Sequence, residues 1–159
     1  MKSAFQIFKT SSLAVFMSFA LSAVSNGQTC SLASITVHQN ILKDAQDLFS
    51  DISDEASTAA LEEDVSGARR FKELSSSAAK SARTVKAQIL GLRRISSANQ
   101  GELTQICREL RGFAKILNQQ VQMIISGIYN APYDRPIRQM LPELKSISSR
   151  YHAAWRVRK

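Results

Sequence analysis

Apolar residues recur along most of this chain at steps of three and four, the spacing of one face of an α-helix. Four runs keep this period, over His38–Ala59, Phe71–Leu92, Leu103–Ile128 and Ile137–Trp155. No segment alternates apolar and polar residues with period two. The pattern therefore predicts helices and no strands.

Polar, glycine-containing and proline-containing stretches separate the four runs. "EEDVSG" ends the first run, and Asp64 or Ser66 is placed to cap the second helix. "SANQG" follows the second run, with Gly101 as the turn residue, and "NAPYDRP" follows the third because proline disrupts a helix interior. We expect helices near 31–62, 66–98, 102–130 and 137–157. Short connections favour antiparallel neighbours, so the predicted fold is all-α, an antiparallel up-down-up-down four-helix bundle.

The first 25 residues have the features of a signal peptide. Lys2 and Lys9 precede the apolar stretch "SSLAVFMSFALSA". Ala23 and Ser25 place small residues at the −3 and −1 positions of a candidate cleavage site, and residues 25–27 form a second candidate. The stretch is short for a membrane span, although a retained anchor is the alternative. We expect residues 1–25 to be removed and residues 26–159 to form one bundle domain, periplasmic or secreted, with no membrane span.

The exported part contains two cysteines, Cys30 and Cys107. Exported proteins commonly pair their cysteines. In an up-down-up-down bundle the first and third helices start at the same end, so a Cys30–Cys107 disulfide is geometrically sensible. The alternative is two unrelated buried thiols. A paired cysteine has no thiolate, so the sequence supports no cysteine nucleophile.

Charge is distributed unevenly along a chain whose net charge is +8. Residues 31–64 contain eight acidic side chains and one lysine, whereas residues 65–159 contain eighteen basic and five acidic side chains. Either the oppositely charged helices pack together, or the basic part attracts an anionic partner. Nucleic acid is not expected, because the chain is predicted to be exported and has no recognised binding motif or interleaved aromatic residues.

The predicted topology places the chain's two histidines at one end of the bundle. His38 lies near the start of the first helix and His152 near the end of the fourth, and both fit the apolar register. Two imidazoles facing each other across an apolar slot can ligate a haem iron from both sides. Phe113 is placed to line such a slot, and Arg156 to pair with a haem propionate. The alternative is two ordinary polar residues near helix ends.

The segment "YHAAWR" is similar to the C-terminal "YHxxYR" pattern of the cytochrome b562 family, and "RGFAKIL" resembles the start of that family's third helix. The resemblance implies a soluble periplasmic four-helix bundle that carries haem b. It also implies that His152 is an axial ligand. His38 stands where the family has its methionine ligand, so the site would be bis-histidine. The chain has no C-x-x-C-H motif, so any haem would be bound non-covalently.

These observations predict a periplasmic haem-b-binding electron-transfer protein that is not an enzyme. His38 and His152 would hold the iron, and the redox partner is not specified by the sequence. The alternative is a haem-free exported helical-bundle binding protein: a periplasmic chaperone, a secretion-system component or a secreted effector. Such a protein would use its basic helix faces.

Overall fold

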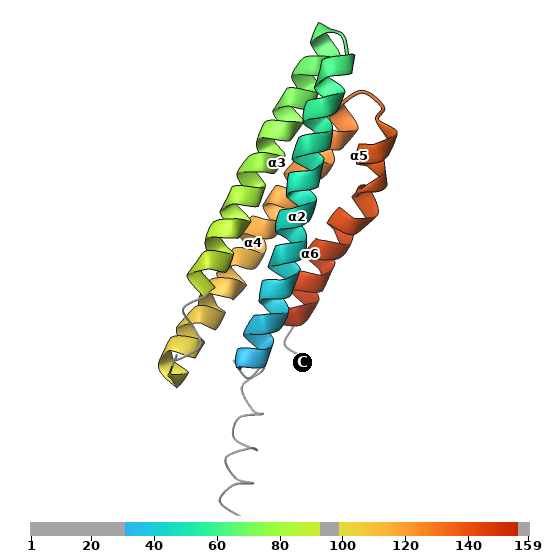
Figure 1. The fold of residues 1–159 in the computed structure, drawn as a ribbon. Helices are drawn as coiled ribbons and strands as arrows, with labels where there is room; N and C mark the ends of the chain where they lie inside the picture. The colour runs from blue at the N-terminus through green and yellow to red at the C-terminus, as the bar shows by residue number, and fades with distance from the viewer. Residues whose placement is uncertain (1–30, 93–98, 156–159) are drawn as a thin grey trace, which may run out of the picture.

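The computed structural model describes residues 31–92 and 99–155, and every element within these ranges is a helix. The elements are α2 (Leu32–Glu62), α3 (Val65–Leu92), α4 (Gln100–Asn130), α5 (Arg135–Gln139) and α6 (Leu141–Trp155). The predicted all-α class is confirmed, with no strand in the described residues. The helices α2, α3, α4 and α6 lie alongside one another, with the short α5 between α4 and α6 (Figure 1).

Polar side chains fix the starts of α2 and α3. The Ser31 hydroxyl accepts a hydrogen bond from the Ser34 backbone N–H at 3.2 Å. The Asp64 carboxylate accepts one from the Gly67 backbone N–H at 2.7 Å. Each bond satisfies a donor that the first turn of a helix leaves without an intrahelical acceptor. The sequence offered Asp64 or Ser66 as the cap of the second helix, and Asp64 provides it.

The start of α4 corrects the expectation for Gly101. Asn99 and Glu102 form a capping box, in which the Asn99 side chain accepts from the Glu102 N–H at 3.0 Å and the Glu102 carboxylate accepts from the Asn99 N–H at 2.8 Å. This reciprocal pair starts the helix at Gln100. Gly101 therefore lies inside the first turn of α4 instead of in the preceding connection.

The expected fourth helix is divided into two. Asp134 caps α5 through the Ile137 N–H at 3.0 Å, and α5 ends at Gln139. A new helix then begins at Leu141, immediately before Pro142. In a continuous helix the N–H of residue 142 would donate to the carbonyl of Arg138, but proline has no N–H and its ring clashes with that carbonyl. The prediction of one helix over 137–157 overlooked this proline.

Small side chains line the contact between α2 and α3, which is the most extensive contact between any two described helices. The buried residues of this pair include Ala56 and Ala78, and the hydroxyl of Ser75 lies 3.2 Å from that of Ser53 and 2.7 Å from that of Ser57. Small residues allow two helices to approach closely. No ion pair joins α2 to α3 among the described residues, so complementary charge is not what holds this pair together.

Larger apolar side chains fill the remainder of the core. Helix α6 contacts both α2 and α4, and α4 also contacts α3. The Ser148 hydroxyl donates to the Asn118 side chain at 2.8 Å, which links α6 to α4. The bulkiest fully buried side chains come from every described helix: Phe49, Phe71, Leu110, Leu117, Ile124, Ile137, Leu144 and Tyr151.

We expect Gly67→Ala to destabilise the protein. A Cβ at Gly67 would lie 3.0 Å from the Glu63 Cβ and 3.1 Å from the Pro132 Cγ, where α3 meets the α4–α5 connection. The helix-propensity gain of alanine is about 1 kcal/mol, whereas overpacking costs about 1–3 kcal/mol. The free energy of unfolding, measured with urea, should therefore fall by about 1 kcal/mol, the difference between these two effects.

Gly112→Ala is the matched control. Gly112 also lies inside a helix, but a Cβ there would meet no atom within 4 Å. This substitution should raise the free energy of unfolding by about 0.5–1 kcal/mol. Equal effects of the two substitutions would contradict the close approach at Gly67.

Candidate functional site

His38 is the only histidine with a buried side chain in the described part of the chain. It is 2% exposed. Its ring contacts that of Tyr151 edge to face, with centroids 5.2 Å apart and planes at 69°. Desolvation by burial lowers the pKa of His38 from 6.5 to about 4, because the charged imidazolium loses its hydration in this apolar environment. The imidazole is therefore neutral at physiological pH.

His152 is exposed on α6, so the prediction that it faces the core is wrong. The neighbouring Tyr151 takes the core position instead and is fully buried. The reason is the helical period. Eight residues after the buried Leu144, at His152, a helix has turned about 80° away from the same face, whereas seven residues after it, at Tyr151, it has turned back by about 20°.

The predicted haem-site residues do not form a slot that fits a haem. Tyr151 fills the space beside His38, and its hydroxyl donates to the Leu110 carbonyl at 2.9 Å. Phe113, which was expected to line the slot, is buried within the core, and Arg156 lies outside the described residues. Because one imidazole is buried behind a tyrosine and the other is exposed, the two cannot ligate one iron in this arrangement.

The predicted disulfide lies partly outside the described residues. Cys107 is buried in α4, and the described part of the chain contains no free cysteine. Its expected partner, Cys30, precedes the described residues. The Cys30–Cys107 disulfide therefore stays a prediction.

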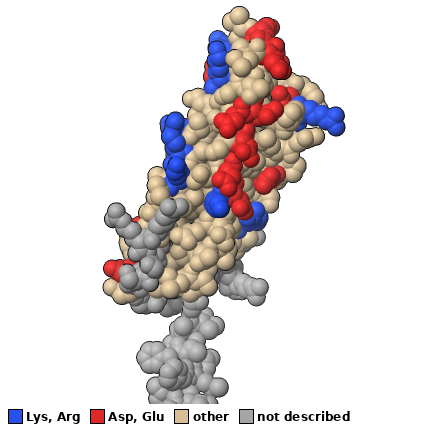
Figure 2. Space-filling model, viewed as in Figure 1, with Lys and Arg blue, Asp and Glu red and all other residues tan. Residues whose placement is uncertain are grey.

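The exposed face of α2 carries a band of acidic side chains over the part of the helix that leads to the α2–α3 turn, and Figure 2 shows basic side chains on either side of it. Its exposed members on successive turns are Asp44, Asp47, Asp51 and Asp54. Asp44 forms an ion pair with Arg150 of α6. Both partners are close to half exposed, so this pair adds little to stability.

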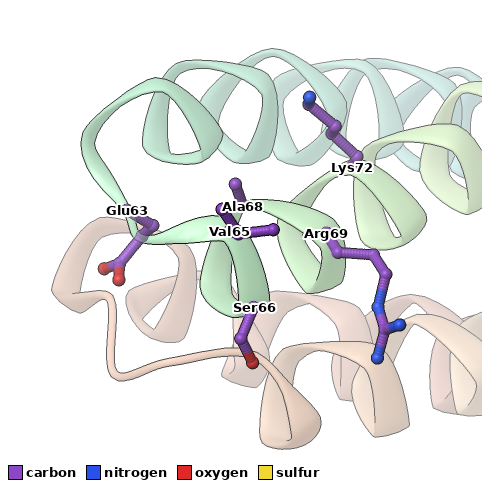
Figure 3. Close-up of a pocket in the computed structure, with 6 residues that line it drawn as sticks. All are labelled: Glu63, Val65, Ser66, Ala68, Arg69 and Lys72. Atoms are coloured by element: carbon purple, nitrogen blue, oxygen red, sulfur yellow. The ribbon is translucent and has the colours of Figure 1, made fainter.

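The turn between α2 and α3 exposes two large apolar residues. Leu61 is 84% exposed and Val65 is 91% exposed. Val65 also lines a shallow hollow of about 700 Å³, together with Glu63, Ser66, Ala68, Arg69 and Lys72. These side chains spread apart instead of converging on one point (Figure 3). The hollow is therefore suited to contact with a surface, and it lacks the convergent polar groups of a small-molecule site.

The connection between α4 and α5 exposes two tyrosines around one arginine. Tyr133 is 75% exposed and Tyr129 is 53% exposed. The guanidinium carbon of Arg138 lies 5.7 Å from the centroid of the Tyr129 ring and 5.1 Å from that of Tyr133. Both distances are within the range of cation–π attraction.

The α2–α3 turn and the α4–α5 connection lie at the same end of the molecule. Their proximity is shown by Gly67 of α3, where an added Cβ would lie 3.1 Å from Pro132 of the connection. We call this surface the tyrosine end and define it by Leu61, Val65, Tyr129, Tyr133 and Arg138. Sequence reasoning treated "NAPYDRP" only as a helix break. Two aromatic residues and an arginine around an otherwise polar, proline-bearing turn were the signal that was overlooked.

The comparisons identify no relative: no known family model, curated protein or solved structure matches this chain. None of the described helices combines the length and hydropathy needed to cross a membrane. Within residues 31–92 and 99–155, no group of three or more histidine, cysteine or acidic side chains is arranged to hold a metal ion. The tyrosine end is therefore singled out only by the exposure and the chemistry of its own side chains, and not by a relative.

We expect acid to destabilise the protein through His38. Its pKa of about 4 in the folded state lies below the unfolded value of 6.5, so the unfolded state binds more protons between these values. The stability that the neutral His38 side chain contributes is present above pH 6.5 and is lost as the pH drops towards 4. Between pH 7.5 and pH 5 the loss from this group should be about 2 kcal/mol, measured by urea unfolding at each pH.

Two variants assign this loss to the buried ring. His38→Leu should remove most of the difference between the two pH values, whereas His152→Ala, at an exposed position, should keep it. A wild-type pH dependence that persists in His38→Leu would show that other groups cause it.

Proposed function

We propose that this chain is an exported, haem-free helical-bundle binding protein that docks a protein partner through its tyrosine end and acts by binding instead of catalysis. The observation that carries the proposal is the exposure of Leu61, Val65 and Tyr133 on two adjoining turns. A solitary exposed apolar side chain needs no explanation, but several large ones gathered at one place are typical of a protein–protein contact.

The composition of the tyrosine end also supports a protein partner. Tyrosine and arginine are enriched among the residues that dominate the binding energy of protein interfaces. Tyr129, Tyr133 and Arg138 provide that combination, and the cation–π contacts with the arginine hold the three side chains in one cluster. Because these side chains are already restricted, they lose less conformational entropy when a partner binds.

The proposed scaffold is an antiparallel up-down-up-down four-helix bundle. In its support, α2 contacts α3 and α6, and α4 contacts the same two helices. The direction of the chain alternates between successive long helices in Figure 1. In such a bundle the α2–α3 turn and the α4–α5 connection share one end, as the approach of Gly67 to Pro132 requires.

Export to the periplasm or the cell exterior, with removal of residues 1–25, is part of the same proposal. An oxidising compartment favours a Cys30–Cys107 disulfide. Thiol labelling of the unfolded, exported protein should then detect no free cysteine unless a reductant is added. Labelling of both cysteines without a reductant would contradict the disulfide and leave the docking proposal unaffected.

Photo-crosslinking tests the docking surface. A photoreactive phenylalanine analogue in place of Tyr133 should give one discrete protein adduct in the producing cells. The same analogue at Ile116, an exposed apolar position within α4, should give none. Changing Val65 to Ser and Tyr129 to Ala in the Tyr133-labelled chain should reduce the adduct at least tenfold, because each change removes apolar contact area.

Each outcome decides the proposal, provided that circular dichroism shows the variants to be folded. Equal adducts from positions 133 and 116 would indicate non-specific capture and contradict docking at the tyrosine end. Absence of any adduct from position 133 would also contradict it.

A haem titration separates this proposal from an electron-transfer role. The purified protein should develop no sharp Soret band with split α and β bands when one equivalent of haem is added and reduced, because Tyr151 fills the space beside His38. His38→Leu should behave like the wild type. A bis-histidine spectrum that both His38→Leu and His152→Ala abolish would overturn the haem-free proposal.

A further inference from the structure

Arg138 is held in place mainly by aromatic rings. Its guanidinium lies near the rings of Tyr129 and Tyr133, and its Nε is buried without a hydrogen-bond partner in the described part of the chain. A guanidinium is a planar fork of N–H donors that matches a carboxylate. Ring contacts attract the charge but satisfy none of these in-plane donors.

The described carboxylates near Arg138 do not pair with it. Asp134 lies four residues earlier, and its carboxylate accepts the Ile137 N–H as the cap of α5. The α2–α3 turn carries Glu62, Glu63 and Asp64, and no ion pair joins any of them to Arg138. The charge of the arginine and its terminal Nη donors therefore stay available for a group from outside the described chain, whereas the buried Nε does not.

We infer that Arg138, oriented by Tyr129 and Tyr133, is a receptor for a carboxylate on an acidic peptide segment of the partner. This inference rests on the proposed function and names the chemistry of the partner that docks at the tyrosine end. The rings restrict the guanidinium, so less side-chain entropy is lost when the carboxylate binds. The exposed ring of Tyr133 supplies apolar contact beside the charge.

A peptide fits this surface better than an anionic membrane does. An anionic membrane attracts clusters of basic residues. Arg138 and Arg135 lie at the tyrosine end, but so do the exposed acidic residues of the α2–α3 turn, which a negatively charged bilayer would repel. A narrow peptide can place its carboxylate on Arg138 and avoid that turn.

The test uses an N-acetylated, C-amidated tetraglutamate peptide as the probe. Binding to the full exported chain is followed through the Nε–Hε NMR signal of Arg138 and the backbone amide signals of Tyr129 and Tyr133. These signals should shift with tetraglutamate and not with tetraglutamine. Arg138→Gln should weaken the peptide's effect on the tyrosine amides at least tenfold, and Arg138→Lys at least threefold, because lysine keeps the charge but lacks the fork.

Arg108→Gln is the matched control, because Arg108 is an exposed arginine of α4 outside the tyrosine end. It should leave binding of the peptide unchanged. Equal binding of tetraglutamine, or equal loss in Arg108→Gln, would overturn the inference. Stronger binding to phosphatidylglycerol vesicles than to the peptide would also overturn it and assign the arginine to a lipid headgroup.

The crosslinking experiment distinguishes this inference from the proposed function. In an Arg138→Gln background, the adduct formed from position 133 should fall at least tenfold. An adduct that persists at full yield would refute the carboxylate receptor and leave partner docking intact. If no adduct forms from position 133 even with Arg138 present, the proposed function fails.

Discussion

Alanine and serine side chains between α2 and α3 allow these two long helices to approach closely, and the other helices are arranged around that pair. Small residues bury little area each, but they bring the two backbones close enough for many dispersion contacts. The hydroxyls of Ser53, Ser57 and Ser75 hydrogen-bond to one another within the contact, so these three groups do not oppose its formation. Bulky side chains from all the described helices then fill the remaining core.

This arrangement also explains where the charges lie. A contact built from small neutral residues leaves the long charged side chains of α2 and α3 on the outside. The acidic band of α2 and the basic residues of α3 therefore face solvent side by side. Residues of opposite sign thus lie next to one another on this face.

Periodicity predicted the helices well and the end of the chain poorly. Three long runs and the Asp64 cap could be predicted because each depends on local sequence. The break at Pro142 was hidden by apolar residues that continue the pattern on both sides. Within α6 the error was one of helical period, because steps of four from Leu144 led to His152 instead of Tyr151. An error of one residue moved an imidazole from solvent into the predicted core, and this placement, together with the resemblance of "YHAAWR" to the cytochrome b562 pattern, was the basis of the haem hypothesis.

The contact between α2 and α6 brings together the first and last described helices. His38 meets Tyr151, and Asp44 meets Arg150, across more than a hundred residues of sequence. Closing so large a loop loses chain entropy before any contact compensates for it. Pairing of α2 with α3 is local in sequence, so we expect it to form earlier. We therefore expect the α2–α6 interface to close late and to open early, and its opening would admit water to the buried imidazole.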